Sequence, residues 1–414
     1  MTIWTKKTDE EIKDRVFAAL DRNVTYQEQN VFGVPASQLD EKVFYKDASF
    51  LKDAPFLSTL MENPNHIGCH TLDTSEPFFA GTQEIERELI EICACDILNG
   101  EAGQQDGYVA SGGTEANMQA IWIYRNLFIG QDNASADEIC ILCSSDSHYC
   151  VDKAANVLSI DIAKVDVDDS TRVASAAAVQ QTVDSLVGRG KKYFVVVVNM
   201  MTTMFGSVDD ADVYVTALQR AGATFRIHVD AAFGGFYYPF ADGKLALDFS
   251  NPNVSSVTLD AHKMLQAPYG TGIFLIRKGL MQYAVTKEAS YVEGQDYTLI
   301  GSRSGANAIA IWMILMKNGP YGWREKIFVL QKRTQWLCDQ LDSIGAEYYR
   351  HPHANIVTIR SDSISRELAE ANWLVPDNHD DPEWYKIVVM DHVTIDKLQP
   401  FVEQLKEAGR ADSL

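Results

Sequence analysis

The run YFVVVVN, at residues 193–199, constrains the fold of this chain more than any other segment. Successive side chains of a strand point to opposite faces of its sheet, so a strand that is apolar at every position has to be covered on both faces. Such strands are typical of parallel sheets with helices packed on each side. Apolar runs at residues 225–229 and 254–259, with a helical pattern at residues 209–221, continue the alternation. The sequence therefore predicts an α/β fold with a mostly parallel sheet covered by helices.

Two of these predicted strands end in charged residues. The first continues into HVDAAFGGF, which places Asp230 at its carboxyl end, and the second continues into DAHKM, which delivers Asp260 and then Lys263. Open α/β sheets bind their ligands in the crevice outside the carboxyl ends of the strands. We therefore expect the carboxylate of Asp230 and the amine of Lys263 to converge at this edge.

A carboxylate and a lysine are the pair that pyridoxal phosphate (PLP) requires. Its aldehyde forms a Schiff base with a lysine, and its ring nitrogen has to stay protonated to accept electrons, which a buried carboxylate favours. Considered separately, Asp230 is more simply interpreted as a helix cap and Lys263 as a solvated surface lysine. The segment YVASGGTEAN favours the cofactor, because small residues precede a helix predicted to start near Thr114. Backbone amides at a helix N-terminus bind anions, so we expect the phosphate at Gly113 and Thr114.

The motifs VDAAFGGF, DAHKM, SGGTEAN, SHY and GSRSG together resemble those of the PLP-dependent group II amino-acid decarboxylases. The resemblance extends from about residue 71 to near the C-terminus. It is nearest to the short branch with bacterial histidine decarboxylase and archaeal tyrosine or aspartate decarboxylases. It implies a fold-type I architecture with a seven-stranded, mostly parallel sheet and a smaller C-terminal α/β domain. It also implies decarboxylation of an L-amino acid to its amine and carbon dioxide through a Schiff base at Lys263, with Asp230 and His148 as the other catalytic residues.

The resemblance implies roles for further residues around the cofactor. His148 stacks on one face of the ring, and the small Ala232 lies under the other face. Thr203 hydrogen-bonds near the ring oxygen. His262 contacts the phosphate or the substrate carboxylate. The chain has Met201 where the family usually has glycine, so a side chain occupies space that glycine leaves open.

A polar segment at residues 287–304 reaches the active site of the partner subunit in members of this family. By that resemblance Ser302 approaches the neighbouring phosphate. Arg303 either supports the structure or holds a substrate carboxylate, and both readings stay open. Tyr291 and Tyr297 are candidates for the tyrosine that protonates the product. The substrate class is also open, between an aromatic or imidazole side chain and an acidic one that would need a cation in the pocket.

Composition excludes several other classes. The net charge of -21 argues against a nucleic-acid partner, because binding phosphates requires a basic surface. We find no apolar run long enough to cross a bilayer and no secretion signal, and expect a cytoplasmic protein. Seven scattered cysteines agree with that compartment. Cys140 and Cys143 have a metal-like spacing, but they are three apart in a predicted strand and point to opposite faces, so we expect no metal site.

We predict an N-terminal arm at residues 1–70, a large PLP-binding domain at residues 71–319 and a small domain at residues 320–414. The resemblance implies a homodimer whose active sites lie at the interface. Two alternatives to the decarboxylase remain at this point. One is a carbon–carbon lyase like sphingosine-phosphate lyase, which shares the motifs. The other is a catalytically silent protein of the same fold, against which the presence of both Lys263 and Asp230 argues.

Overall fold

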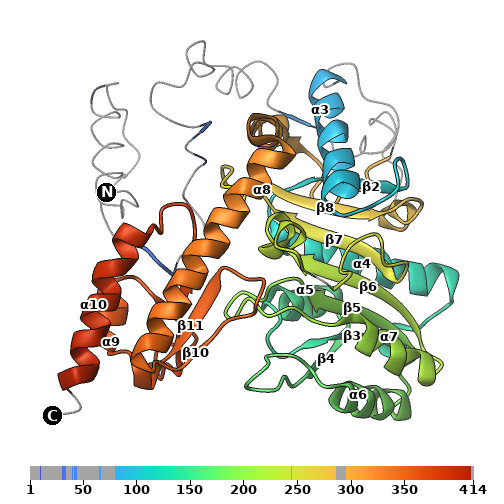
Figure 1. Ribbon diagram of the computed structural model, residues 1–414. Coiled ribbons are helices and arrows are strands. Elements are labelled where there is room, and N and C mark those ends of the chain that lie inside the picture. The colour runs from blue at the N-terminus through green and yellow to red at the C-terminus, as the bar shows by residue number, and fades with distance from the viewer. Residues whose placement is uncertain are drawn as a thin grey trace, which may run out of the picture.

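A computed structural model describes residues 80–411 apart from 244 and 286–294, together with residues 10, 30–33, 40, 42–43 and 65–66. Most of the predicted N-terminal arm therefore lies outside the described residues, and so does Tyr291. Within them, a seven-stranded sheet forms the centre of the larger part of the molecule, and a four-stranded sheet forms the centre of the C-terminal part (Figure 1). Every helix in the described part is too short or too polar to cross a membrane.

The large sheet has the order β2-β8-β7-β6-β5-β3-β4. Adjacent strands from β7 to β4 are parallel, and only β8 runs against its neighbours. The strands are β2 (Gln105–Ala110), β3 (Ile139–Ser144), β4 (Asp161–Val165), β5 (Tyr193–Asn199), β6 (Thr224–Ala231), β7 (Val254–Asp260) and β8 (Gly272–Arg277). The predicted fold class is confirmed.

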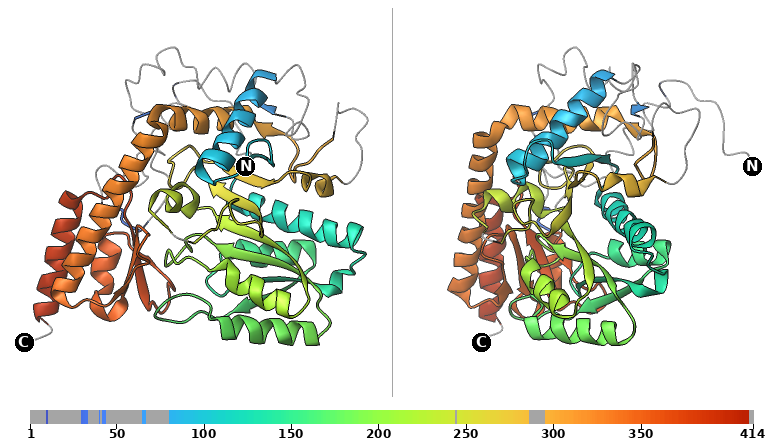
Figure 2. Two further views of the ribbon diagram at one scale, coloured as in Figure 1. Left: turned by 45° about the vertical axis from the view of Figure 1, so that its right-hand side comes forward. Right: turned by 90° about the vertical axis from the view of Figure 1, so that its right-hand side faces the viewer.

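The valines of β5 are divided between the two faces of the sheet. Val195 and Val197 belong to the apolar cluster under α4 (Gly113–Gln131) and α5 (Cys150–Leu158). Val196 and Val198 belong to the cluster under α6 (Ala176–Gly188) and α7 (Ala211–Arg220). Figure 2 shows these helices as layers on either side of the sheet. All four valines are fully buried, which confirms the prediction of a strand covered on both faces.

The two cysteines with metal-like spacing also point to opposite faces. Cys140 packs in the cluster on the α6 and α7 side, and Cys143 in the cluster on the α4 and α5 side. Burial raises the pKa of the Cys140 thiol to about 11 and that of Cys143 to about 12, so both stay protonated and inert. Among the described residues no cluster of potential ligands could hold a metal ion.

Two helices are irregular. Helix α3 (Ala80–Glu91) continues into a π-helical turn, Ile92–Ile97, after which the Leu98 amide bonds the Cys93 carbonyl five residues earlier. Helix α8 (Gly305–Ile344) bends at Gly319, which has φ 62°, because Pro320 cannot continue the helix.

The C-terminal part contains an antiparallel sheet of order β10-β11-β13-β12. Its longer strands are β11 (Ile356–Arg360) and β13 (Trp384–Val388), and the helix α10 (Ile395–Ala411) follows them in the chain. The remaining elements are β10 (Tyr348–Tyr349), β12 (Val375–Pro376) and α9 (Arg366–Ala371). The bend of α8 leads into this part (Figure 2), but the boundary between residues 319 and 320 stays a prediction.

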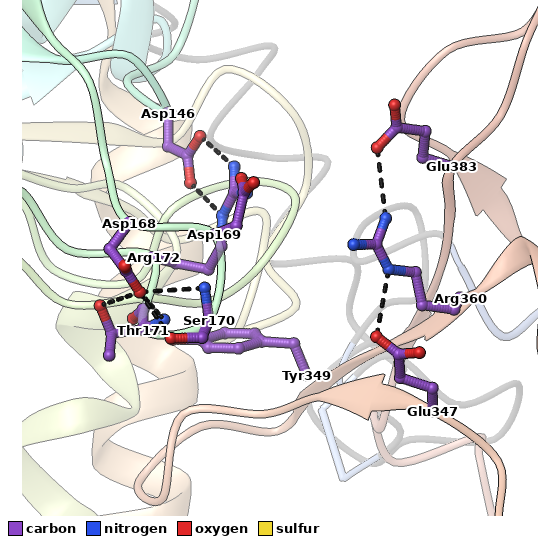
Figure 3. A network of polar contacts seen from close by, with 10 residues as sticks. All are labelled: Asp146, Asp168, Asp169, Ser170, Thr171, Arg172, Glu347, Tyr349, Arg360 and Glu383. Carbon is purple, nitrogen blue, oxygen red and sulfur yellow. Dashed lines mark hydrogen bonds and ion pairs between the residues drawn. The ribbon is translucent and has the colours of Figure 1, made fainter.

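A polar network joins the two parts beside the central sheet (Figure 3). The guanidinium of Arg172 forms two bonds with the carboxylate of Asp146, of 2.7 and 3.0 Å. It also lies 3.9 Å from the ring centroid of Phe205, which packs edge-on against Trp384 of β13. From β10, the Tyr349 hydroxyl donates to the carbonyl of Thr171 at 3.1 Å. The C-terminal part is thus held against two loops at the carboxyl end of the large sheet.

Burial should make the Asp146–Arg172 pair worth more than its exposed neighbour in Figure 3, Arg360–Glu383. The side chain of Arg172 is 12% exposed and that of Asp146 is 11% exposed. In the other pair the exposed fractions are 30% for Arg360 and 72% for Glu383. We expect Asp146→Asn to lower the free energy of unfolding by about 2 kcal/mol, since it weakens charged hydrogen bonds away from water. The matched Glu383→Gln should cost less than about 1 kcal/mol. Urea denaturation measures both, and equal losses would contradict the assigned difference.

Candidate active site

A cavity of about 340 Å³ lies at the carboxyl ends of β5, β6 and β7. It contains eight of the residues predicted from the sequence: Gly113, Thr114, His148, Thr203, Asp230, Ala232, His262 and Lys263. Its other lining residues are Ser111, Gly112, Glu115, Asn117, Asn199, Met201, Thr202, Phe233 and Asp260. Parallel strands bring these side chains together because Asn199 and Asp230, which are far apart in sequence, are directly paired in the register of β5 and β6.

One end of the cavity is shaped for an anion. Helix α4 starts at Gly113, so its first backbone amides have no partner within the helix. A Cβ atom at Gly113 would lie 2.8 Å from a carboxylate oxygen of Asp260, and one at Gly272 would lie 2.6 Å from the Gly112 backbone. Both positions therefore require glycine. Nδ1 of His262 is buried and has no hydrogen-bond partner among the described residues, which leaves it available to a ligand.

The amine of Lys263 is held by an acid at the end of β7. Its Nζ lies 3.1 Å from Oδ2 of Asp260, and His262 Nε2 lies 3.6 Å from the same oxygen. Burial opposes the charge of the amine, but the attraction of Asp260 and then of Asp230 outweighs it and raises the pKa of Lys263. The lysine therefore rests as an ammonium ion paired with Asp260.

Asp230 has a hydrogen-bond donor on each carboxylate oxygen. The amide of Asn117 donates to Oδ2 at 2.7 Å, and the backbone N–H of Ala232 donates to Oδ1 at 3.1 Å. Asn117 in turn accepts from His228 Nε2 at 2.9 Å. No role was predicted for these two residues, although Asn117 ends the motif SGGTEAN and His228 begins HVDAAFGGF.

His148 is brought to the cavity by the loop after β3. Burial lowers the pKa of its imidazole, an effect that Asp230 opposes and Lys263 reinforces. The backbone N–H of Cys150 donates to Nδ1 at 3.3 Å, so the proton of the neutral ring is on Nε2. A neutral imidazole is suited to packing on a flat aromatic ring.

The loop after β5 differs from the family pattern in sequence, at a position whose backbone conformation glycine adopts more easily. Met201, in the place of the family glycine, has φ 71°, a left-handed conformation that costs a residue with a side chain about 1 kcal/mol or more. It is 3% exposed and lines the cavity. The side chain of Thr202 bonds Ser207 at 2.7 Å, whereas Thr203, the residue predicted to approach a ring oxygen, also lines the cavity.

Lys386 is a second lysine beside the cavity, and no motif in the sequence indicated it. It comes from β13 of the C-terminal part and is 4% exposed. Its Nζ donates to the carbonyl of Thr203 at 3.1 Å. Burial, and then the charge of Lys263, lower its pKa to about 8. The sequence around Lys386 is that of an ordinary strand and does not indicate a functional site, because only tertiary packing brings β13 to the cavity.

Four predicted residues are not among the described residues that line the cavity. Arg303 is 6% exposed and forms a two-point ion pair with Glu86, while its Nη1 also donates to the Val109 carbonyl at 3.1 Å. These contacts are of the kind that its structural alternative requires, and the role of Arg303 stays a prediction. Ser302 precedes β9 (Arg303–Ser304) and is exposed. Tyr291 lies outside the described residues, and the Tyr297 hydroxyl donates to Gln295 at 3.1 Å.

These residues fit PLP on structural grounds. The N-terminus of α4 and the free Nδ1 of His262 offer donors to a phosphate. Glycine at 113 and 272 lets Asp260 and the Gly112 backbone pack closely at this end of the cavity. Asp230, oriented by donors on both oxygens, offers a carboxylate to a ring nitrogen. Lys263 offers an amine that can attach the aldehyde. All three lie in one cavity.

Comparison with known proteins agrees with this chemistry. Residues 79–348 match the family model described as the pyridoxal-dependent decarboxylase conserved domain. The chain is 50% identical to the tryptophan decarboxylase of Clostridium sporogenes, over 99% of both proteins. It is 32% identical to the probable L-tyrosine/L-aspartate decarboxylase of Methanocella arvoryzae, over 86% of this chain and 94% of that protein.

A solved structure supports the fold independently. The L-methionine decarboxylase from Streptomyces sp. 590 superposes with a TM-score of 0.79 at 21% identity, covering 97% of this chain and 95% of that one. At that identity the likeness concerns the fold alone, while the family match and the 50% identical relative concern the chemistry. This chain therefore belongs to the pyridoxal-dependent decarboxylases and is a PLP-dependent enzyme that decarboxylates an amino acid.

Proposed function

We propose that the substrate is an aromatic L-amino acid, with tryptophan first among the candidates, and that the product is the corresponding amine. The observation that carries this proposal is the 50% identity to a tryptophan decarboxylase over 99% of both chains. Of the two substrate classes that the sequence left open, this supports the aromatic one.

The charges of the cavity support the same choice. Its described lining includes three acidic residues, Glu115, Asp230 and Asp260, and no arginine. The one lysine of the lining, Lys263, is needed for the cofactor. An acidic substrate side chain would meet an excess of negative charge there, whereas an indole or phenol ring would not. Phe233 and Met201 add apolar surface to the same walls.

The cofactor roles are assigned by position. The amides of Gly113 and Thr114 and the imidazole of His262 hold the phosphate, and Lys263 supplies the amine that attaches the aldehyde. When bound, PLP supplies a protonated ring that accepts the electron pair left behind as carbon dioxide departs. Asp230 keeps the ring nitrogen protonated by placing a negative charge beside it.

The flat faces of the ring need contacts of a different kind. His148, as a neutral imidazole, covers one face, and the methyl group of Ala232 allows close approach to the other. Thr203 would form a hydrogen bond near the ring oxygen. Ser302 would approach the phosphate bound in the neighbouring subunit.

Lys386 is the described cation best placed for the carboxylate of an incoming amino acid. Arg303 is engaged by Glu86, whereas Lys386 donates to the neutral carbonyl of Thr203. A carboxylate brought next to Lys386 would stabilise its protonated form, since an opposite charge favours the charged amine.

We also infer a homodimer, with an N-terminal arm at residues 1–70 and domains at residues 71–319 and 320–414, in the cytoplasm. Two exposed rings mark a side of the cavity that a partner subunit would cover. Tyr149 is 63% exposed and packs on His148, and Tyr269 is 61% exposed and stacks on His262. Large aromatic side chains in the open are typical of subunit contacts.

The substrate proposal predicts a ranking of amino acids. With PLP added, kcat/KM for tryptophan, tyrosine or phenylalanine should exceed that for aspartate or glutamate by roughly a hundredfold or more, because an acid would leave unpaired charge in the pocket. Carbon dioxide release and the matching amine, followed for each substrate, measure this. A preference for aspartate would reject the aromatic proposal and leave the decarboxylase itself intact.

Removing the amine of Lys263, which attaches the cofactor, should abolish the reaction. Lys263→Ala should lose turnover, and the absorbance of the lysine-bound cofactor should disappear, because no other described lysine lines the cavity. Lys278→Ala, at an exposed lysine, is the matched control and should behave as the unaltered protein. Turnover retained by Lys263→Ala would remove the lysine from its assigned role.

Neutralising Asp230 should separate binding from chemistry. Asp230→Asn should still bind PLP, since the anion end of the cavity is untouched, but kcat should fall by about a hundredfold or more because the ring nitrogen loses its counter-charge. Spectroscopic titration with PLP and steady-state kinetics measure the two effects. Near-normal kcat in a PLP-loaded variant would show that the charge of Asp230 is not used.

A further inference from the structure

A stripe of polar side chains runs through the packed layer between α4 and the strands β6 and β7. It consists of Asn117 and Tyr124 on α4, His228 on β6, and Ser256 and Thr258 on β7. Each of the five is at most 1% exposed. Seven residues separate Asn117 from Tyr124, which puts them on one face of the helix, while His228 pairs with Ser256 in the register of the strands.

The hydrogen bonds of this stripe form one chain that ends at the active site. The Tyr124 hydroxyl bonds Ser256 Oγ at 2.5 Å, and Ser256 Oγ lies 2.7 Å from His228 Nδ1. On the other side of the ring, His228 Nε2 lies 2.9 Å from Asn117 Oδ1. Asn117 Nδ2 then donates to Asp230 Oδ2 at 2.7 Å.

Chemistry fixes the direction of every bond in the chain. A carboxylate only accepts, so Asn117 has to present its NH₂ group to Asp230 and its oxygen to His228. That oxygen requires a donor, which places the proton of His228 on Nε2. Burial lowers the pKa of His228 to about 4, so the ring is neutral and Nδ1 accepts from the hydroxyl of Ser256. Ser256 Oγ then accepts from Tyr124.

The remaining groups around the chain do not disturb this order. Thr258 Oγ1, at 3.2 Å from His228 Nε2, is a second acceptor for the same proton. Cys150 Sγ lies 3.1 Å from Asn117 Nδ2, and burial raises the pKa of its thiol to about 12. Burial also raises the pKa of Tyr124. Apart from Asp230, every titratable group along the chain is therefore neutral near pH 7.

Packing alone would not select these side chains. The surrounding layer is apolar, with Ala116, Ala120 and Ile121 of α4 fully buried in it. Apolar residues of similar volume would fill the same space, and replacing buried polar groups in that way is often neutral or stabilising. A fully satisfied, one-way chain that ends on Asp230 therefore indicates a task at the active site.

We propose that Tyr124, Ser256, His228 and Asn117 are positioning residues that fix the Asp230 carboxylate in its charged, oriented form toward the ring nitrogen of the cofactor. The chain acts through Asp230 and touches neither substrate nor cofactor. The proposal rests on the role assigned to Asp230 under the proposed function.

The first test is nuclear magnetic resonance of the protein labelled with ¹⁵N-histidine, with and without PLP. His228→Gln identifies the signals of His228. We expect a neutral ring with its proton on Nε2 that does not titrate from about pH 6 to about pH 8. A ring protonated on Nδ1, or one that titrates in this interval, would overturn the proposal.

The second test compares His228→Leu with Val257→Ala, each loaded with ¹⁵N-labelled PLP. Val257 lies between Ser256 and Thr258 but packs in the apolar cluster on the opposite face of the sheet, so its truncation removes packing only. The pH at which the ring nitrogen of bound PLP loses its proton should fall by about one unit in His228→Leu, with kcat roughly tenfold lower and KM nearly unchanged. Val257→Ala should lower Tm and leave both quantities as they are.

His228→Gln keeps an amide donor for Asn117 and should recover part of the loss seen in His228→Leu. An equal shift in His228→Leu and Val257→Ala, or none in either, would reduce the chain to packing and reject the proposal. The role of Asp230 and the role of the hydrogen-bonded chain can be rejected independently. Full turnover in Asp230→Asn would reject the role of Asp230, whereas a titrating His228 would reject the chain and leave Asp230 in place.

Discussion

Burial of the central strands on both faces is the constraint on which the rest of the structure depends. Because helices cover β5 and β6 on each side, a polar side chain within these strands has no access to water. Polar groups are therefore confined to the carboxyl ends, where Asn199, Asp230 and Asp260 face one cavity, or they need a complete set of partners. The active site and the buried polar chain behind it both follow from that confinement.

The site holds its charges in place before any ligand arrives. Lys263 is paired with Asp260, Asp230 has a donor on each oxygen, and His148 and His228 are kept neutral by burial. Groups held in this way need little reorganisation during a reaction, which is how enzymes obtain most of their electrostatic stabilisation. The second layer of contacts, from α4 and β7, matters as much for this as the cavity lining itself. The C-terminal part completes the arrangement, since it supplies Lys386 and contacts the loop that carries Thr203.

Much of this site could be predicted because its parts follow local rules. The apolar run at residues 193–199 predicted a strand covered on both faces, and the residues after the strands predicted Asp230 and Lys263 at one edge. Glycines before α4 predicted an anion site. Residues whose function depends on a distant partner could not be recognised in this way. Lys386 sits in an ordinary strand of the small sheet, and the pairing of Arg303 with Glu86 joins residues that are more than two hundred positions apart.

The sequence by itself determined the fold class, the cofactor and the residues that end the strands, because strand periodicity and helix starts are properties of short segments. Tertiary structure decided which of these residues meet and in what state. The neutral ring of His228, the left-handed conformation of Met201 and the place of Lys386 beside Thr203 all depend on burial or on contacts between segments far apart in the chain. Protonation and orientation are set by the full surroundings of a group, and only the folded chain supplies those surroundings.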